Sequence, residues 1–335
     1  MESVKKKLYI IAEVGSVHDG SFGNACKLIE LAADSGAHAV KFQTHFGDAE
    51  SLSNAKRPSY FKNEDRISYF NRTQFSFEQY KKFIILCKKK KIHFLSSPFS
   101  IEAVNFLEKL NLTTYKVPSG EVTNHPLLEK IARTKKNVFL STGMSNWKEI
   151  DAAVKIFSSK NQLTLMQCTT MYPCLPKRVG INVIKEMVNR YNLPVGFSDH
   201  TIGFVAAIGA VFAGATVIEK HITFSKLMYG SDAFNALDPT EFKNFCKYLN
   251  EAFEISKNRV NKNDIFWLNK TKKIFEKSIV ASKNISKNSK LKLRDLSFKK
   301  PGDGVSAARY KEILGLKLIK SIKKNTKILF KYLKK

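Results

Sequence analysis

The sequence predicts an α/β protein in which a (β/α)8 TIM barrel is followed by a small β-rich domain. Short β-rich runs alternate with longer amphipathic segments from Leu8 to about Ser256, and this alternation is typical of repeated βα units around a parallel sheet. The chain contains eight such pairs, which is the number that closes a (β/α)8 barrel. Its 335 residues, 43% of them hydrophobic, are enough for a large core and an appended domain.

The predicted strands are bounded by turn-forming residues and followed by segments with helical periodicity. Ser100 precedes an acidic first turn and Asp238 precedes a proline, and both arrangements are typical of helix N-termini. The strands are Tyr9–Glu13, Ala39–Gln43, Ile92–Ser96, Thr114–Val117, Val138–Ser141, Leu163–Cys168, Pro194–Ser198 and Thr216–Lys220. The helices are Gly23–Ser35, Phe77–Lys90, Ile101–Leu110, His125–Arg133, Asn146–Ser158, Gly180–Tyr191, Gly203–Phe212 and Pro239–Ser256.

A domain boundary is predicted after the last of these helices. Residues 257–273 are polar and rich in lysine, which is typical of a connector. We therefore expect a barrel domain over residues 1–256 and a small domain over residues 274–335, which is near the lower size limit for independent folding. Within the small domain we expect short β elements at Ser278–Ala281, Lys290–Leu293 and Lys317–Ile322, and a turn at Pro301–Gly304.

The sequence gives no sign of export or of membrane insertion. The apolar stretch that follows the basic N-terminus ends at Glu13, too early for a signal peptide. The apolar run Phe204–Phe212 is far shorter than the roughly 18 residues of a membrane span. The five cysteines are odd in number and scattered, so they indicate neither a disulfide framework nor a zinc site. We therefore expect a soluble protein of the reducing cytoplasm that has no membrane partner.

The formal net charge of +28 is unusual. Such an excess attracts nucleic acid, anionic lipid or small anionic substrates. The lysines recur along the whole chain and do not form an arginine-rich stripe interleaved with aromatic residues. This distribution favours a solvated lysine-rich surface, and a basic nucleic-acid-binding protein is kept as the non-enzymatic alternative.

Polar residues end every predicted strand, and in (β/α)8 enzymes the active site lies at these carboxyl ends. Strands one to four end in or run on to Glu13, Lys41, Gln43, Ser96, Ser97, Lys116, Ser119 and Glu121. Strands five to eight end in or run on to Ser141, Thr142, Thr169, Thr170, Tyr172, Ser198, Asp199, His200, Glu219 and His221.

These residue types suit an anionic substrate. Lys41 and Lys116 supply positive charge, while serine and threonine hydroxyls supply directed hydrogen bonds, so a phosphorylated substrate is expected. A lysine such as Lys116 also has a simpler interpretation, as part of an ion pair at the barrel rim, but burying it in a strand is costly without a purpose. Glu13 and Glu121 are candidates for proton transfer or for binding sugar hydroxyls.

His200 and His221 end adjacent strands and are suited to binding one borderline divalent ion that acts as a Lewis acid. Asp199 and Glu219 are predicted to orient the two imidazoles. A single histidine at a strand end is more often structural, and the remaining histidines are assigned to that class: His18, His38, His45, His93 and His125. Cys168 and Cys174 are not predicted to be metal ligands.

Several sequence blocks resemble one enzyme family. They are IAEVGSVHDG at Ile11–Gly20, AVKFQTH at Ala39–His45, SSPFS at Ser96–Ser100, YKVPSGE at Tyr115–Glu121, STGMS at Ser141–Ser145, CTTMYP at Cys168–Pro173, GFSDHT at Gly196–Thr201 and IEKHIT at Ile218–Thr223. In order and spacing they are similar to bacterial N-acetylneuraminate (sialic acid) synthases and their legionaminate and pseudaminate relatives. The segments Lys277–Ser282 and Lys299–Gly304 resemble the antifreeze-like SAF domain that follows the barrel in these synthases.

The resemblance implies a reaction, a metal and an assembly. Phosphoenolpyruvate would be joined to the open-chain aldehyde of an N-acyl amino sugar, with loss of phosphate. Mn²⁺, or Mg²⁺ or Co²⁺, would be bound by His200 and His221, and a domain-swapped homodimer would bring the SAF domain over the partner's barrel. The resemblance assigns the phosphate to Lys116, Ser119, Ser97 and Ser141, the carboxylate to Ser198 and Tyr172, and the sugar to Glu13, Lys41, Gln43, Asn63, Glu121 and Asp232.

Three positions depart from the family pattern. Val17 replaces an asparagine after the first strand, and Thr170 replaces an asparagine often found after the sixth. Lys300 occupies the position of the SAF-domain arginine that contacts the acyl sugar in the family. A lysine keeps the positive charge but lacks the bidentate donor fork of an arginine. The main alternative function is a phosphoenolpyruvate-condensing barrel of the 3-deoxy sugar acid phosphate class, which places a metal-binding cysteine early in the barrel where this chain has Glu13.

Overall fold

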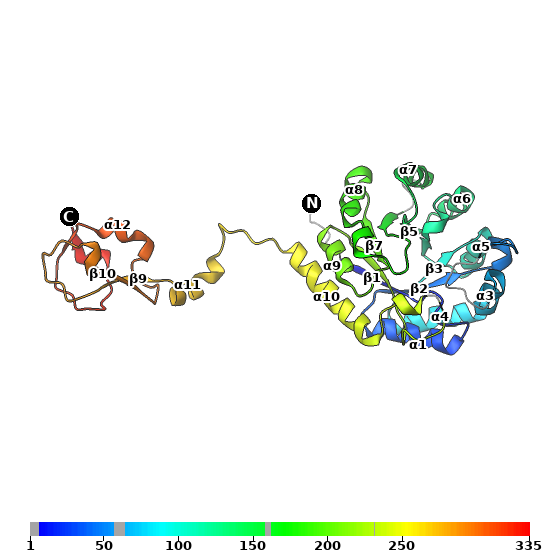
Figure 1. The fold of residues 1–335 in the computed structure, drawn as a ribbon, viewed down its shortest axis with the longest axis horizontal. Coiled ribbons are helices and arrows are strands. Elements are labelled where there is room, and N and C mark those ends of the chain that lie inside the picture. Colours follow the sequence, from blue (N-terminus) through cyan, green and yellow to red (C-terminus); the bar gives the residue numbers. More distant parts are fainter. Residues whose placement is uncertain (1–6, 57–63, 158–161, 231) are drawn as a thin grey trace. The chain divides into compact units, whose positions relative to one another are not determined.

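The computed structural model describes residues 7–56, 64–157, 162–230 and 232–335 (Figure 1). The chain divides into two compact units, one ending at Asn258 and one beginning at Arg259. Each unit has a hydrophobic core of its own.

Eight parallel strands close the first unit into a barrel, in chain order (Figure 1). The predicted fold class is therefore confirmed, and the predicted strand ends differ from the observed ones by at most two residues. The strands are β1 (Tyr9–Glu13), β2 (Ala39–Thr44), β3 (His93–Pro98), β4 (Thr114–Val117), β5 (Asn137–Ser141), β6 (Leu163–Gln167), β7 (Val195–Asp199) and β8 (Val217–His221).

The strand register places the polar ends of neighbouring strands at the same level along the barrel axis. Glu13 on β1 is paired with Lys41 on β2 and with His221 on β8. Ser198 on β7 is paired with Glu219 on β8. Because side chains alternate along a strand, residues two apart on one strand face the same side of the barrel wall.

In the described part of the chain, eight helices follow the strands, and they surround the barrel (Figure 1). Asp238 and Glu241 form a capping box at the start of the last of them, as the proline after Asp238 suggested. Two short helices, α2 (Gly47–Glu50) and α3 (Arg66–Thr73), lie between β2 and the next long helix and were not expected from the sequence. The eight are α1 (Phe22–Asp34), α4 (Phe77–Lys90), α5 (Ile101–Lys109), α6 (His125–Arg133), α7 (Trp147–Ile156), α8 (Ile181–Tyr191), α9 (Val205–Phe212) and α10 (Pro239–Lys257).

The barrel has two apolar layers. Outward-facing strand residues such as Ile10, Phe42 and Ile218 pack with the surrounding helices in one large core. A second, small cluster gathers strand residues of the opposite orientation: Ile11, Ala39, Leu95, Met166 and Val217. This second cluster fills the barrel interior below the polar residues, since on β8 Val217 is followed at alternate positions by Glu219 and His221.

The second unit contains two antiparallel strand pairs. They are β9 (Ser278–Ala281) with β10 (Leu296–Lys299), and β11 (Lys317–Leu318) with β12 (Leu333–Lys334). Two helices accompany them, α11 (Asn269–Phe275) and α12 (Tyr310–Ile313).

Two predicted elements of this unit are wrong. Lys290–Leu293 is not a strand, because only Lys290 forms an isolated bridge and Leu293 begins a 3-10 turn. The predicted strand Lys317–Ile322 stops at Leu318, with a separate bridge at Ile322. Short segments joined by single β-bridges do not need a long alternation of apolar and polar residues. The sequence pattern therefore does not show where their strands begin and end.

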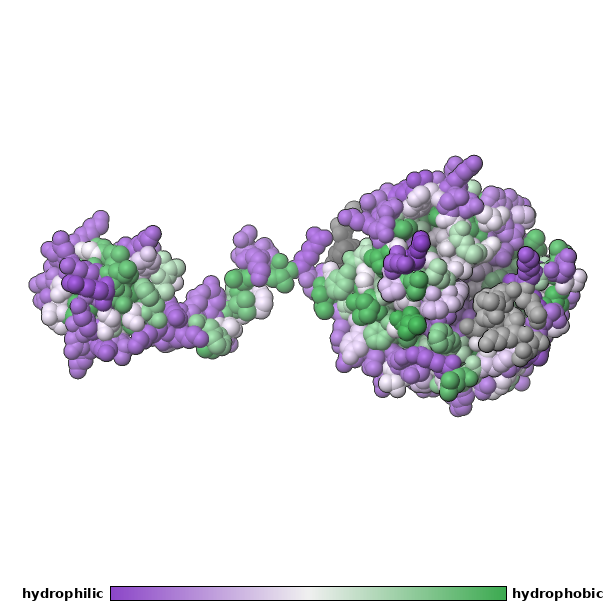
Figure 2. Space-filling view, in the orientation of Figure 1, coloured by the Kyte–Doolittle hydropathy of each residue, from purple (hydrophilic) through white to green (hydrophobic). Residues whose placement is uncertain are grey.

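None of the helices in the described ranges is long and apolar enough to cross a membrane. Hydrophilic residues cover much of the visible face of both units, with apolar residues scattered among them (Figure 2). Scattered apolar residues are normal for a protein surface, and the hydrophilic remainder fits the solvated lysine-rich surface that the sequence suggested.

Candidate active site

A cavity of about 230 Å³ opens at the carboxyl ends of the strands. It lies where the sequence predicted the active site, and most of the candidate residues line it. From the candidate set its wall includes Glu13, Lys41, Gln43, Ser97, Lys116, Ser119, Ser141, Thr170, Tyr172, Ser198, His200, His221 and Asp232.

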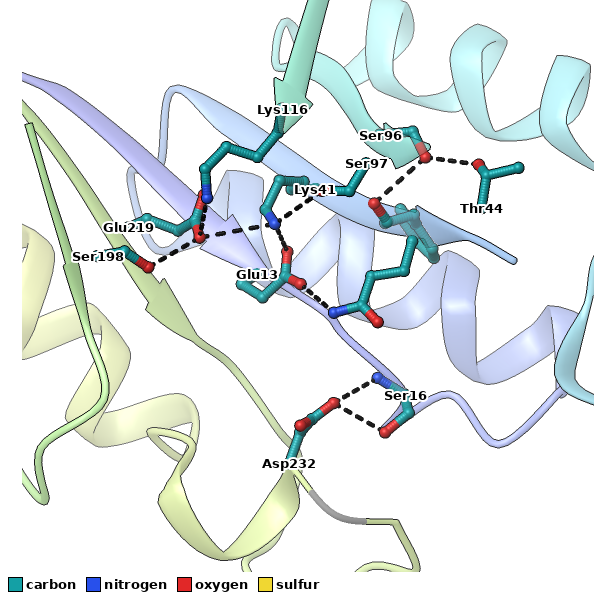
Figure 3. A network of polar contacts seen from close by, with 12 residues as sticks. Glu13, Ser16, Lys41, Thr44, Ser96, Ser97, Lys116, Ser198, Glu219 and Asp232 are labelled. Carbon is teal, nitrogen blue, oxygen red and sulfur yellow. Dashed lines mark hydrogen bonds and ion pairs between the residues drawn. The ribbon is translucent and has the colours of Figure 1, made fainter. Parts of the chain in front are cut away.

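Four charged side chains form a network at the floor of the cavity (Figure 3). Lys41 Nζ lies 3.0 Å from Glu13 Oε2 and 3.5 Å from Glu219 Oε1. Lys116 Nζ lies 2.9 Å from the same Glu219 oxygen. All four side chains are at most 5% exposed. Two lysines and two carboxylates therefore balance their charges inside the barrel, as buried ions require.

The network perturbs the pKa values of its members. Burial works to raise the pKa of Glu219, but Lys116 and Lys41 outweigh burial and lower it to about 2. Burial also lowers the pKa of Lys116, with Lys41 adding to the effect and Glu219 opposing it. For Lys41, Glu13 and Glu219 outweigh burial and raise the pKa. Glu219 is thus a carboxylate held between two cations.

Hydroxyl groups surround the two lysines. Ser97 Oγ accepts a hydrogen bond from Lys41 at 3.2 Å, and Ser198 Oγ donates one to Glu219 at 3.0 Å. Ser119 Oγ accepts from the backbone N–H of Gly143 at 3.0 Å. The Oγ of Ser141 is buried and has no hydrogen-bond partner among the described residues.

Gly143 keeps this part of the cavity open. A Cβ atom at this position would lie 2.4 Å from Cys168 Sγ and 2.5 Å from Thr170 Oγ1, so no larger residue fits. Two ammonium groups, several hydroxyls and an open space form an arrangement that suits an anion, as the sequence predicted.

His200 and His221 face the cavity with their ring centroids 6.1 Å apart. His200 Nδ1 lies 2.9 Å from the carbonyl oxygen of Thr169. Because a carbonyl can only accept, Nδ1 carries the proton and Nε2 carries the lone pair, which faces the Tyr172 hydroxyl at 3.1 Å. Burial and His221 lower the pKa of His200 to about 3, so the ring is neutral. His221 Nδ1 is buried and has no hydrogen-bond partner among the described residues.

These imidazole nitrogens are suitable donors for a divalent ion. Within the described ranges no group of three or more His, Cys, Asp or Glu side chains is arranged to hold a metal. An ion at this point would therefore have two histidine ligands and positions left for water and substrate. The donor set fits that role.

The predicted orienting role of Asp199 and Glu219 toward the imidazoles is wrong. Asp199 Oδ1 accepts from the N–H and the hydroxyl of Thr201 at 2.8 and 2.7 Å, and Asp199 also pairs with Lys220. Glu219 faces the lysines instead. Asp199 and His200 are neighbours in the chain and point to opposite faces. Glu219 shares the inner face with His221 but pairs with Lys41 and Lys116.

Asp232 joins two loops at the rim of the cavity (Figure 3). Its Oδ2 accepts from both the backbone N–H and the Oγ of Ser16, each at 2.8 Å. Gly15 has a φ of +53°, and a Cβ there would lie 2.3 Å from the same Asp232 oxygen. A glycine at position 15 is therefore required both by the backbone and by the approach of Asp232.

The structure does not show three of the predicted site residues at the cavity, each for a different reason. Glu121 does not line it, although Ser119 and Gly120 do; its carboxylate accepts from Asn124 Nδ2 at 2.7 Å, and burial raises its pKa. Asn63 lies outside the described residues. Lys300 belongs to the second unit, where its Nζ lies 4.9 Å from the ring centroid of Phe275.

The cavity also contains residues that sequence reasoning missed. His45, assigned to the structural class, lines it, and so do Arg66, Phe70 and Phe99. Strand alternation offered a signal for His45, because it follows Lys41 and Gln43 at intervals of two. The same spacing links Glu219 to His221. Arg66 and Phe70 lie on α3, a helix that was not predicted, so nothing pointed to them.

Comparisons with known proteins identify the family of this chain. The NeuB family model matches residues 28–261 and the SAF domain model matches residues 276–333. The N,N'-diacetyllegionaminic acid synthase of Campylobacter jejuni subsp. jejuni is 37% identical over 96% of this chain and 98% of that protein. The pseudaminic acid synthase of the same organism is 31% identical over 95% of this chain and 94% of that protein.

The fold has solved counterparts as well. The crystal structure of an N-acetylneuraminic acid (sialic acid) synthetase from Leptospira borgpetersenii serovar Hardjo-bovis matches with a TM-score of 0.70 and 27% identity. That match covers 78% of this chain and 92% of the other. The resemblance drawn from the sequence blocks is confirmed: the chain belongs to the NeuB family and has a SAF domain after its barrel.

Proposed function

We propose that this protein is a nonulosonic acid synthase. It condenses phosphoenolpyruvate with the open-chain form of an N-acylated hexosamine, such as N-acetylmannosamine, and releases phosphate. The observation that supports this most directly is the cavity in which Lys41, Lys116 and Ser141 face the same space as the imidazoles of His200 and His221. The names of the two Campylobacter relatives agree with it.

Phosphoenolpyruvate is assigned to the floor of the cavity. Lys116, Ser119, Ser141 and Ser97 hold its phosphate, and Ser198 and Tyr172 flank its carboxylate. Phosphoenolpyruvate is a trianion, and the two lysines of the network are already neutralised by two carboxylates. Lys41 and Lys116 must therefore turn partly from Glu219 to the ligand. Preorganised cations of this kind stabilise developing charge in a site that excludes water.

A divalent ion, Mn²⁺ in the first place and otherwise Mg²⁺ or Co²⁺, is proposed between His200 and His221. When bound, such an ion would draw electron density from the aldehyde oxygen of the acceptor and make its carbon more electrophilic. The neutral state of His200 supports this assignment, and so does His221 Nδ1, which has no hydrogen-bond partner among the described residues.

Side chains of this protein would then transfer the protons that the reaction requires. A carbon–carbon bond forms between C3 of phosphoenolpyruvate and the aldehyde carbon, and the aldehyde oxygen takes up a proton. Water adds at C2 and gives up a proton, after which the bond from C2 to the phosphate oxygen breaks. Glu13, which bonds Gln43 Nε2 at 2.7 Å and pairs with Lys41, is the proposed proton-transfer group.

Sugar contacts are proposed for Gln43, Thr170 and Asp232, and also for Glu121 and Asn63. The second unit is proposed to act across a homodimer, where Lys300 of one subunit meets the acyl sugar in the barrel of the other. Residues 1–256, 257–273 and 274–335 are kept as the proposed barrel, connector and small domain. The five cysteines are all free, which suits the cytoplasm proposed for the reaction.

Product analysis tests the function. The protein would be incubated with phosphoenolpyruvate, MnCl₂ and one of three acceptors: N-acetylmannosamine, a diacetamido hexose or a phosphorylated aldose. We expect phosphate release and a product with the mass of acceptor plus pyruvate for an N-acyl sugar. Release with the phosphorylated aldose alone would favour the 3-deoxy sugar acid phosphate class, and no release with any acceptor would refute both.

A further inference from the structure

The imidazole of His45 lies at the rim of the cavity between two groups that accept hydrogen bonds. Its Nε2 lies 3.0 Å from Gln43 Oε1, and its Nδ1 lies 2.8 and 3.0 Å from the two carboxylate oxygens of Glu50. The side chains of His45 and Glu50 are only 11% and 5% exposed. Phe70 and Phe99 both stack on the ring, with centroids 3.8 and 4.0 Å away. These contacts fix the position and the plane of the imidazole.

The side-chain amide of Gln43 connects His45 to Glu13. Its Nε2 donates to Glu13 Oε1 at 2.7 Å, and the other oxygen of Glu13 pairs with Lys41 at 3.0 Å. If the amide were flipped, its oxygen would face the Glu13 carboxylate, and two acceptors cannot bond each other. Gln43 Oε1 therefore faces His45 as an acceptor, and His45 Nε2 carries the proton that it accepts.

The same reasoning places a further proton on the other side of the ring. A neutral imidazole with its proton on Nε2 would turn a lone pair on Nδ1 toward the Glu50 carboxylate, which is an acceptor as well. A proton must therefore lie between His45 Nδ1 and Glu50. With Nδ1 satisfied in this way, the Nε2–H of His45 stays directed at Gln43.

The backbone and the side chain of Gln43 are held by different groups. Its carbonyl oxygen accepts from the Tyr80 hydroxyl at 3.1 Å, and Tyr80 is buried in the large apolar core. Among the described residues, the side-chain amide bonds Glu13 and His45 only. Without the His45 donor, the amide oxygen would lose its partner in the protein and the amide could rotate away from Glu13.

We infer that His45 is a positioning residue for Glu13. Its Nε2–H holds the Gln43 amide in the orientation that donates to Glu13, and Glu50 keeps His45 in the protonation state that makes this donation possible. The Glu13 carboxylate is thereby held in one orientation, as proton transfer requires. This inference rests on the proposed function and deepens it, because it adds two residues that act through Glu13 and not on the substrate.

Three variants at position 45 separate hydrogen bonding from packing. His45→Gln places an amide nitrogen near the position of Nε2, where it can still donate to Gln43. His45→Asn places its amide near the position of Nδ1, where it can donate to Glu50 but does not reach Gln43. His45→Leu fills the space and donates to neither.

Steady-state kinetics with phosphoenolpyruvate, MnCl₂ and an N-acyl acceptor would give kcat and KM for each protein. His93→Asn serves as the control, because it makes the same substitution at an exposed histidine that begins β3 at the opposite end of the barrel. Circular dichroism and the melting temperature would verify folding.

We expect kcat to depend on the donor that faces Gln43. His45→Asn and His45→Leu should each lower kcat about tenfold or more, because general acid–base catalysis contributes about 100- to 10,000-fold and depends on the position of the group. His45→Gln should stay within about fivefold of the wild-type protein, because it keeps the hydrogen bond. The KM for phosphoenolpyruvate should change less than about threefold in all three, since an interaction used for the chemical step appears in kcat. His93→Asn should change neither value.

A double-variant cycle tests whether His45 acts through Gln43. Gln43→Leu removes the amide that connects His45 to Glu13. His45→Asn should then lower kcat about tenfold in the wild-type protein and less than about twofold in Gln43→Leu, because effects of residues that share one hydrogen-bond network are not additive.

Other results would overturn the inference. A kcat for His45→Leu equal to that of His45→Gln would show that the ring acts by packing alone. Equal effects of His45→Asn with and without the Gln43 amide would show that His45 does not act through it. In both cases the proposed synthase activity would stand. No product from the wild-type protein with any acceptor would overturn the function and this inference together.

Discussion

Lys220 and Asp199 form an ion pair between the outer faces of β7 and β8, with Nζ 3.1 Å from Oδ2 and neither side chain exposed. Each residue is the chain neighbour of a proposed metal ligand, since His200 follows Asp199 and His221 follows Lys220. The pair therefore fixes the spacing of the two strand ends that present the imidazoles.

Removing one partner of this pair should destabilise the barrel. Lys220→Met leaves the Asp199 charge buried and unpaired, which costs about 3–5 kcal/mol of the free energy of unfolding. The double variant Asp199→Asn/Lys220→Met should recover much of this loss, because no uncompensated charge remains. Urea unfolding measures both, and titration calorimetry should show weaker Mn²⁺ binding by the single variant. A double variant no more stable than Lys220→Met would contradict the argument.

Lys116→Ala should raise the KM for phosphoenolpyruvate about tenfold or more and leave the KM for the acceptor within about threefold. A hydrogen bond to a charged group contributes about 1.5–3 kcal/mol, and Lys116 is assigned to the phosphate. Steady-state kinetics with each substrate varied in turn would measure the effect. Lys88→Ala, at an exposed lysine on α4, is the control. Similar increases for both substrates would remove Lys116 from the phosphate site.

Chelation should abolish activity, and added Mn²⁺ should restore it. His200→Ala and His221→Ala should each weaken Mn²⁺ binding by about 100-fold, because even residues behind the ligands contribute about 10- to 100-fold. Titration calorimetry on the metal-free protein gives this affinity without any need for activity. His93→Ala is the matched control, since His93 begins β3 at the opposite end of the barrel and bonds Tyr9. Full activity after exhaustive chelation would disprove the metal site.

The stability of the barrel should fall between pH 6.5 and pH 4 because of His18. This histidine is 5% exposed, its Nδ1 accepts from the Gly20 N–H at 3.0 Å, and its ring centroid lies 4.6 Å from that of Phe75. Burial lowers its pKa to about 4 from 6.5. Below pH 6.5 the unfolded chain binds the proton more readily, so stability is full above that pH and is lost as pH falls.

The loss from His18 amounts to about 3 kcal/mol at pH 4, since one pKa unit corresponds to about 1.4 kcal/mol. The melting temperatures of the wild-type protein and of His18→Gln, measured at pH 7.5 and pH 5, would test it. We expect a smaller decrease on acidification for the variant, whatever its stability at pH 7.5. An equal decrease would show that other groups cause the acid sensitivity.

A chain that ends at Asn258 should keep a folded barrel and lose activity. The large apolar core of the barrel unit ends at Phe253 and needs no residue from the second unit. In the full chain, Lys300→Arg should lower the KM for an N-acetyl acceptor, because a guanidinium offers a fork of donors; the gain is about 1–2 kcal/mol at most. Kinetics, circular dichroism and sedimentation would follow both changes. An active truncated chain would show that the SAF domain is not part of the site.

Most of the residues predicted from the strand ends line the cavity, because residues two apart at the end of a barrel strand face the same side. Lys41 and Gln43 were recognised on this basis, and His45 continues the same alternation. It was missed because a histidine flanked by phenylalanine and threonine in the sequence gives no hint of the rings from α3 and from the loop after β3 that enclose it.

The roles of acidic residues were harder to predict than their positions. Glu219 was expected to support an imidazole, yet it compensates two lysines from β2 and β4. Closeness in the sequence suggested the first role, whereas closure of the barrel brings Lys41 of β2 and Lys116 of β4 against Glu219 and gives it the second. Arg66 had no signal at all, because α3 is a short helix of mixed composition whose place is set by packing against the barrel mouth.

The apolar cluster of Ile11, Ala39, Leu95, Met166 and Val217 fills the barrel interior below the polar residues, so we expect both substrates to enter the cavity from the carboxyl ends of the strands. Phosphoenolpyruvate bound at Lys116 would lie deeper in the cavity than an acceptor bound beside His45, Phe70 and Phe99. We therefore expect the two substrates to bind in a fixed order, with phosphoenolpyruvate first. An acceptor analogue that cannot react should then trap phosphoenolpyruvate in the cavity. Such an analogue should inhibit uncompetitively against phosphoenolpyruvate, as expected when two substrates bind in a fixed order.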